Sequence, residues 1–148
     1  MKLGISFIIL VNVPIVAAPL PKEKQSDQEK LSGKWECIGL QHGGRQIKPG
    51  SRFHELTFQF DKNQITIAVN FKTPQLVGTF SLDPSKSPKH IDLLYKVHEG
   101  KKILGIYELK GDVLTLITAS RPEKPPPKAF STARSTSQKM WTLRRVNK

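Results

Sequence analysis

The side chains of this sequence that could carry catalysis are few and scattered. The four histidines fall at expected strand ends or loops, without the spacing of metal ligands: His42, His54, His90 and His98. No glycine-rich phosphate loop, no Gly-x-Ser-x-Gly elbow and no His-Glu-x-x-His pattern occurs. No pair of carboxylates suggests general acid–base work from its sequence spacing. We therefore expect neither an enzyme nor a metal or cofactor site.

Cys37 is the only cysteine, so no disulfide can form within the chain. It lies beside Trp35 in a run with strand character, where a free cysteine usually serves as a small buried hydrophobic residue. A reactive or dimer-forming thiol is the alternative.

The formal net charge is +12, from 24 Lys and Arg against 12 Asp and Glu. Such an excess favours anionic surfaces or acidic protein partners through long-range attraction, or simply keeps the protein soluble. The basic residues are scattered and the aromatic residues fall on expected core positions. We therefore expect no specific nucleic-acid binding.

Residues 1–18 have the features of a secretory signal peptide: Lys2, an apolar run and small residues at Val16-Ala17-Ala18. We expect export to the periplasm, the cell envelope or the exterior, with no transmembrane anchor left after processing. Pro19 follows the expected cut directly, which leaves the cleavage position open. Residues 19–25 then form a linker, and 26–148 suffice for one domain.

The domain begins with a short helix and continues as strands. Ser26 and Glu29 have the spacing of a capping box, and Gly33 can end the helix. Alternation with a period of two then predicts strands at 34–40, 55–61, 64–71, 76–83, 90–97, 103–119 (two strands, a hairpin around Gly111) and 139–146. In the fifth strand, Val97 is expected to face the core. The fold class is therefore all-β: an eight-stranded up-and-down antiparallel barrel, since closure removes exposed edges.

One connection breaks this regularity. Residues 121–139 are basic and rich in proline, so we expect an extended and solvated surface loop. The alternative is a docking segment for an anionic surface or for a protein that binds polyproline.

The barrel interior is the expected binding site. In the 103–119 hairpin we place Tyr107 and Leu109 inside and Glu108 outside, towards lysines; the reverse register would put Glu108 inside the barrel. A cavity for one small, mainly apolar ligand would be lined by Phe58, Ile67, Phe80, Leu93, Tyr107 and Leu116. The alternative is a non-enzymatic interaction protein with a filled barrel, which uses its basic surface and the 121–139 loop.

Several motifs resemble a known family. Gly33-Lys34-Trp35 is similar to the Gly-x-Trp signature of lipocalins and other calycin barrels. The further matching segments are Asp83-Pro84, 88–93, 105–114, Arg121-Pro122 and 128–132. Together they resemble a bacterial family of uncharacterised lipocalin-like proteins known chiefly from planctomycetes, over roughly residues 27–146.

The resemblance implies a calycin barrel in which Trp35 plugs the closed end and a basic side chain of the last strand, Arg144 or Arg145, lies across it. It implies no biochemical activity. Residues 123–127 stand as a small insertion relative to that family.

Overall fold

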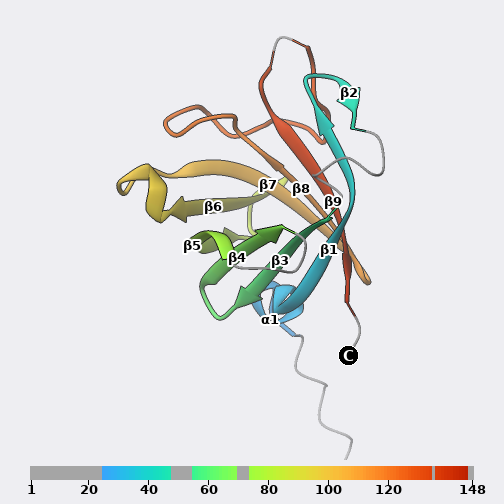
Figure 1. Cartoon of the computed structure of the whole chain (residues 1–148), viewed down its shortest axis with the longest axis vertical. Helices are drawn as coiled ribbons and strands as arrows, with labels where there is room; N and C mark the ends of the chain where they lie inside the picture. Colours follow the sequence, from blue (N-terminus) through green and yellow to red (C-terminus); the bar gives the residue numbers. More distant parts are fainter. Residues whose placement is uncertain (1–24, 48–54, 70–73, 135, 147–148) are drawn as a thin grey trace, which may run out of the picture.

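A computed structural model describes residues 25–47, 55–69, 74–134 and 136–146 (Figure 1). The expected signal peptide, most of the expected linker, His54 and Phe71 lie outside these ranges. The elements within them are α1 (Asp27–Leu31), β1 (Gly33–His42), β2 (Arg45–Gln46), β3 (Leu56–Asp61), β4 (Gln64–Val69), β5 (Pro74–Asp83), β6 (Lys89–Tyr95), the 3₁₀ helix η2 (Lys96–His98), β7 (Ile103–Lys110), β8 (Val113–Thr118) and β9 (Lys139–Arg145).

The strands close into a barrel. Each long strand pairs antiparallel with the next along the chain, and β9 returns to pair with β1. The two-residue β2 only extends β1 as a small hairpin. The predicted eight-stranded up-and-down antiparallel barrel with a short N-terminal helix is therefore confirmed, and most strand bounds agree to within two residues.

Local sequence explains the turns at the α1 end of the barrel. Gly111 has φ +57° and lets the chain reverse tightly between β7 and β8, as its position in the 103–119 hairpin predicts. The capping box of α1 is also present, because the Ser26 side chain accepts from the Glu29 amide and Glu29 accepts from the Ser26 amide.

The core fills the barrel interior. Alternate residues of every strand point inward, so that Trp35 lies opposite Phe58 and Tyr107 opposite Leu116 in the hydrogen-bonded register. The interior set comprises Leu31, Trp35, Cys37, Leu40, Leu56, Phe58, Phe60, Ile65, Phe80, Ile91, Leu93, Tyr95, Ile103, Tyr107, Leu114, Leu116, Ala119 and Leu143. In the described part of the chain these residues form one continuous core.

The prediction for Val97 was wrong. Strand β6 ends at Tyr95 and the chain turns into η2, where Glu99 and Gly100 adopt positive φ. The side chain of Val97 is 65% exposed rather than part of the core. Every second residue from Ile91 to Val97 is apolar, so this pattern alone could not show that the strand ends at Tyr95.

Most described residues of the 121–139 connection are exposed, as predicted, but part of the connection packs on the barrel. The segment between β8 and β9 has no helix or strand over its described residues, yet Pro127 is buried. The Gly44 amide donates to the Thr132 hydroxyl at 3.1 Å, which fastens the segment to the β1–β2 hairpin. Phe130 lines a surface pocket together with Glu108 on the outside of β7.

This packing explains two residues that the sequence pattern places outside the barrel. Ile106 and Ile117 face each other across β7 and β8 on the outer side, and both are fully buried. Phe130 lies beside Glu108, the next outward-facing residue after Ile106 on β7. We therefore infer that the β8–β9 connection covers Ile106 and Ile117. The barrel therefore has a small second apolar layer on this face.

Candidate functional site

The barrel has two chemically different ends. The α1 end, where α1 and the β3–β4, β5–β6 and β7–β8 turns lie, is sealed: Leu31 and Trp35 have no exposed surface. The indole Nε1 of Trp35 donates to the Leu31 carbonyl oxygen at 2.8 Å, which fixes α1 onto the core. The opposite end, at the last residues of β1, β4 and β8, is called the distal end below.

Arg145 makes the expected contact with the plug tryptophan. Its guanidinium carbon lies 4.3 Å from the centre of the Trp35 ring, a cation–π distance. The same guanidinium donates to the carbonyl oxygens of Ser32, at 2.8 Å, and Lys30. These are carbonyls at the C-terminal end of α1 that otherwise lack partners, so Arg145 caps the helix while it covers the indole.

Arg144 points to the opposite side of β9. It donates two hydrogen bonds to the Glu36 carboxylate, at 2.9 and 2.6 Å, on the exposed face of the sheet. Gly33 leaves room for Arg145, because a Cβ atom at position 33 would lie 3.2 Å from the Arg145 guanidinium. Its φ of +121° is also one that other residues rarely adopt. Gly33, Trp35 and Arg145 thus form one packed unit, and Arg144 is outside it.

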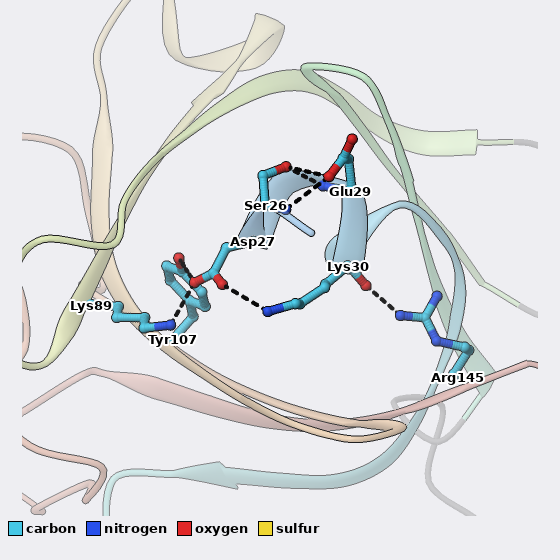
Figure 2. Close-up of polar contacts among 7 residues, drawn as sticks. All are labelled: Ser26, Asp27, Glu29, Lys30, Lys89, Tyr107 and Arg145. Carbon is cyan, nitrogen blue, oxygen red and sulfur yellow. Dashed lines mark hydrogen bonds and ion pairs between the residues drawn. The ribbon is translucent and has the colours of Figure 1, made fainter. Parts of the chain in front are cut away.

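Asp27 is the centre of a polar cluster at the same end (Figure 2). Its carboxylate accepts from Lys89 Nζ at 2.6 Å and from the Tyr107 hydroxyl at 2.7 Å, with Lys30 Nζ at 3.8 Å. The Lys89 hydrogen bond is the main cause that lowers the pKa of Asp27. Burial, together with the bond to Asp27, raises the pKa of Tyr107. The cluster therefore ties α1 to β6 and β7.

A pocket of about 600 Å³ opens beside this cluster. Its charged lining contains three cations, Lys30, Lys89 and Arg145, and three anions, Asp27, Glu29 and Asp112. All three cations are already engaged with carboxylates of the same pocket. The arrangement therefore has little capacity left for a charged ligand, and we assign it to closure of the barrel.

The predicted ligand-binding residues occupy the middle of the barrel. Phe58, Leu93, Tyr107 and Leu116 are at most 1% exposed and Phe80 is 5% exposed, so other side chains surround them. Only Ile67 of the predicted set remains partly exposed. The structure thus brings the six residues into one core, and ligand contact at them stays a prediction.

Two partly exposed apolar side chains of the core, Leu82 and Leu109, lie near the α1 end. The other such side chains lie towards the distal end. They pack on the core yet keep some accessible surface: Ile47, Ile67, Val69, Leu76 and Trp141, the distal apolar group. Trp141 faces inward, opposite Leu116, and its ring meets that of Phe58 edge-on, with 5.6 Å between ring centres. Ile67, Val69, Leu76 and Trp141 have the inward parity of their strands, and Ile47 packs on the core from the residue after β2.

Period-two alternation could have found most of the distal apolar group, because Val69, Leu76 and Trp141 share the inward parity of their strands. What the sequence does not show is which inward residues lie near an end. No sequence signal pairs Asp27 with Lys89 either, since 62 positions separate them.

The remaining reactive side chains have structural roles. Cys37 is buried and free, burial raises the pKa of its thiol, and the thiol donates to the Gly39 carbonyl oxygen at 3.4 Å. Glu108 is outside the barrel and pairs with Lys110 at 2.9 Å, so the favoured register of β7 is confirmed. The described residues contain no group of three or more His, Cys, Asp or Glu that could hold a metal ion.

Over the described residues, no helix has the length and apolar character needed to cross a membrane. Comparison of the chain with protein-family models, curated proteins and solved structures found no match. The structure itself is an eight-stranded closed antiparallel barrel, compatible with the calycin and lipocalin-like class of folds.

Proposed function

We propose that this protein is an exported, non-enzymatic binding protein that holds one small, mainly apolar ligand at the distal end of its barrel. The observation that carries the proposal is the distal apolar group. Inward-facing Ile67, Val69, Leu76 and Trp141 keep accessible surface, whereas the α1 end is sealed. Inward-facing apolar side chains with accessible surface at one end of a barrel suit the binding of a small, mainly apolar molecule.

The burial pattern also indicates how deep such a ligand would lie. Phe58 and Leu116 are packed on all sides and would form the floor of the site, with Trp141 and Ile67 as its walls. Tyr107, which reaches Asp27 at the α1 end, would lie below this floor and would not touch the ligand. The bound molecule would thus occupy the distal part of the barrel only.

Two sequence features support the assignment to exported lipocalin-like proteins. Residues 1–18 have the composition of a signal peptide. Gly33, Trp35 and Arg145 form the helix-capped tryptophan plug that the resemblance to the planctomycete-type family implies. Because one fold hosts unrelated functions, this resemblance supports the kind of protein and not the identity of the ligand.

The test is native mass spectrometry of the chain recovered from the envelope fraction of its own host. A reproducible extra mass that denaturation removes would support the proposal and give the formula of the ligand. N-phenyl-1-naphthylamine, a neutral apolar fluorophore, then serves as a binding probe. Ile67→Gln is expected to weaken its binding, while Thr66→Gln, on the outer face of the same strand, is the matched control.

A second candidate is favoured by the filled middle of the barrel. Buried Phe58, Leu93, Tyr107 and Leu116 leave the interior without space at those residues, as expected for a barrel that acts through its surface. A bare mass, together with no binding of the neutral fluorophore, would favour this interaction protein. Its partners would then be sought on the basic surface.

A further inference from the structure

A polar pocket lies beside the distal end and is separate from the charged cluster at α1. Its volume is about 410 Å³, and it is formed by the two ends of the β8–β9 connection. The residues that line it are Ala119, Ser120, Arg121, Lys124, Pro125, Thr136, Ser137 and Gln138. We call it the connection pocket. It joins residues that are up to 19 positions apart, so the fold of the connection creates it.

The two cations of this pocket have no carboxylate partner in the part of the chain that the structure describes. Among the described residues, neither Arg121 nor Lys124 makes an ion pair or a side-chain hydrogen bond. The nearest acid in the sequence, Glu123, is held by Lys101 at 3.5 Å. Unlike the pocket at α1, the connection pocket therefore carries two cations that no described carboxylate pairs with.

Neutral donors complete the lining. The hydroxyl groups of Ser120 and Ser137 and the amide of Gln138 have no hydrogen-bond partner in the described part of the structure. Guanidinium, ammonium and hydroxyl groups together are the donors that recognise carboxylate, sulfonate or phosphate oxygens. The chemistry of the lining thus points to an acidic group.

The connection pocket and the distal apolar group lie at the same end of the barrel, where β8 ends and β9 begins. Ala119 lines the pocket and also belongs to the barrel core. Thr118, the residue before Ala119, pairs with Lys139 on β9. Lys139 is two positions before Trp141, so both lie on the inward side of β9. One bound molecule could therefore contact Trp141 with one part and reach Arg121 with another.

We propose that the connection pocket binds the acidic head group of an amphiphilic ligand whose apolar part lies against the distal apolar group. The inference rests on the proposed function and narrows its ligand class from apolar molecules to acidic amphiphiles. Arg121 and Lys124 would then be the residues that determine specificity for the head group.

The experiment uses two fluorophores that differ only in the acidic group. N-phenyl-1-naphthylamine reports the apolar site alone, and 1-anilinonaphthalene-8-sulfonate carries the same rings with a sulfonate. We expect the purified protein to bind 1-anilinonaphthalene-8-sulfonate more tightly than N-phenyl-1-naphthylamine. The double variant Arg121→Gln/Lys124→Gln should weaken sulfonate binding by about tenfold, since exposed charge contacts are individually modest. Binding of the neutral probe should stay within about twofold of wild type.

The matched control is Lys62→Gln/Lys86→Gln, which removes the same charge from turns at the α1 end. It should leave both probes unaffected, which separates the connection pocket from general attraction to a basic protein. Equal loss of sulfonate binding in the two double variants would overturn the inference.

Two further outcomes separate the inference from its premise. Binding of both probes with no effect of Arg121→Gln/Lys124→Gln would overturn the head-group site and leave the apolar site standing. Failure of the neutral probe to bind would overturn the proposed function and the amphiphile with it. Inorganic phosphate at constant ionic strength should not displace the sulfonate probe; full displacement would identify a simple anion site instead of an amphiphile site.

Discussion

Two adjacent arginines show how strand parity separates a structural role from a surface one. Arg145 and Arg144 are neighbours at the end of β9, and the sequence offers no reason to choose between them. In the barrel, only Arg145 faces Trp35 and the end of α1, while Arg144 pairs with Glu36 on the surface. The choice depends on the register of β9, and that register is a property of the closed sheet.

Replacement of each arginine by methionine should lower the free energy of unfolding by different amounts. Arg145→Met removes a cation–π contact and two hydrogen bonds to helix carbonyls, so we expect the free energy of unfolding to fall by about 2–3 kcal/mol. Arg144→Met breaks an exposed ion pair and should cost less than about 1 kcal/mol. Chemical denaturation at neutral pH measures both values; equal losses would refute the helix-capping role of Arg145.

Asp27 should make the stability of the protein depend on acid. Its pKa in the folded state is below the ordinary value of 3.8, chiefly because Lys89 donates to its carboxylate. A carboxyl group whose pKa is lowered by folding stabilises the protein above its unfolded pKa, and this contribution disappears as the pH falls through the folded pKa. Protonation of Asp27 should therefore loosen the attachment of α1 to β6 and β7.

Asp27→Asn tests this linkage. We expect the variant to lose about 1–2 kcal/mol of unfolding free energy at pH 7, because one charged hydrogen-bond acceptor is removed. The difference from wild type should shrink as the pH is lowered from 5 towards 2. Urea denaturation across this range gives both curves, with the exposed Asp61→Asn as the control. A difference that stays constant down to pH 2 would contradict the assignment.

At the scale of elements, part of the β8–β9 connection packs on the barrel, which its amino-acid composition does not predict. Its prolines and lysines predict a solvated loop, and most of it is exposed, yet Pro127 is buried and Phe130 lies beside Glu108 on the outer face of β7. The sequence feature that indicates such packing lies in the strands, where the apolar residues Ile106 and Ile117 occupy outward positions. Apolar residues on an outer face require a cover, but the sequence does not say which segment supplies it.

Two residues of β8 test this cover. Ile117 and Val113 share the outer face of the strand, but Ile117 is fully buried and Val113 is 36% exposed. Ile117→Ala should therefore cost about 2–4 kcal/mol of unfolding free energy, as truncation of a buried side chain does. Val113→Ala should cost less than about 1 kcal/mol. Thermal and chemical denaturation compare the two, and a similar small loss for both would show that Ile117 is not covered.

Most strands could be predicted because their signal is local. Alternation at 55–61 and 103–119 and the turn at Gly111 specify strands and hairpins within about ten residues, and a run of such hairpins closes into a barrel. The 3₁₀ turn at Val97 was missed because the alternation continued into it. The Asp27–Lys89 bond and the connection pocket join residues distant in sequence, so only the closed fold creates them.

At the scale of the whole molecule, the barrel is polarised. The α1 end holds a tryptophan plug and paired charges, and the distal end holds partly exposed apolar side chains and two cations that no described carboxylate pairs with. Charges that pair within one pocket stabilise the fold, whereas unpaired donors beside an apolar surface suit recognition. The sequence predicted a ligand in the interior or mouth of the barrel; burial of Phe58, Leu93 and Leu116 favours the mouth at the distal end for the proposed site.

Export is the last prediction at this scale, and it determines where a ligand could be met. If residues 1–18 are a signal peptide, the protein in the envelope fraction should begin near Pro19, and its net charge should be one unit lower through the loss of Lys2. Intact mass spectrometry of the fractionated cell measures both location and cleavage. Ile9→Arg, which interrupts the apolar run, should retain the full-length chain inside the cell, while Lys128→Gln in the mature chain should be exported normally. Full-length wild-type chain found only inside the cell would contradict export and would restrict the proposed ligand to molecules of the cytoplasm.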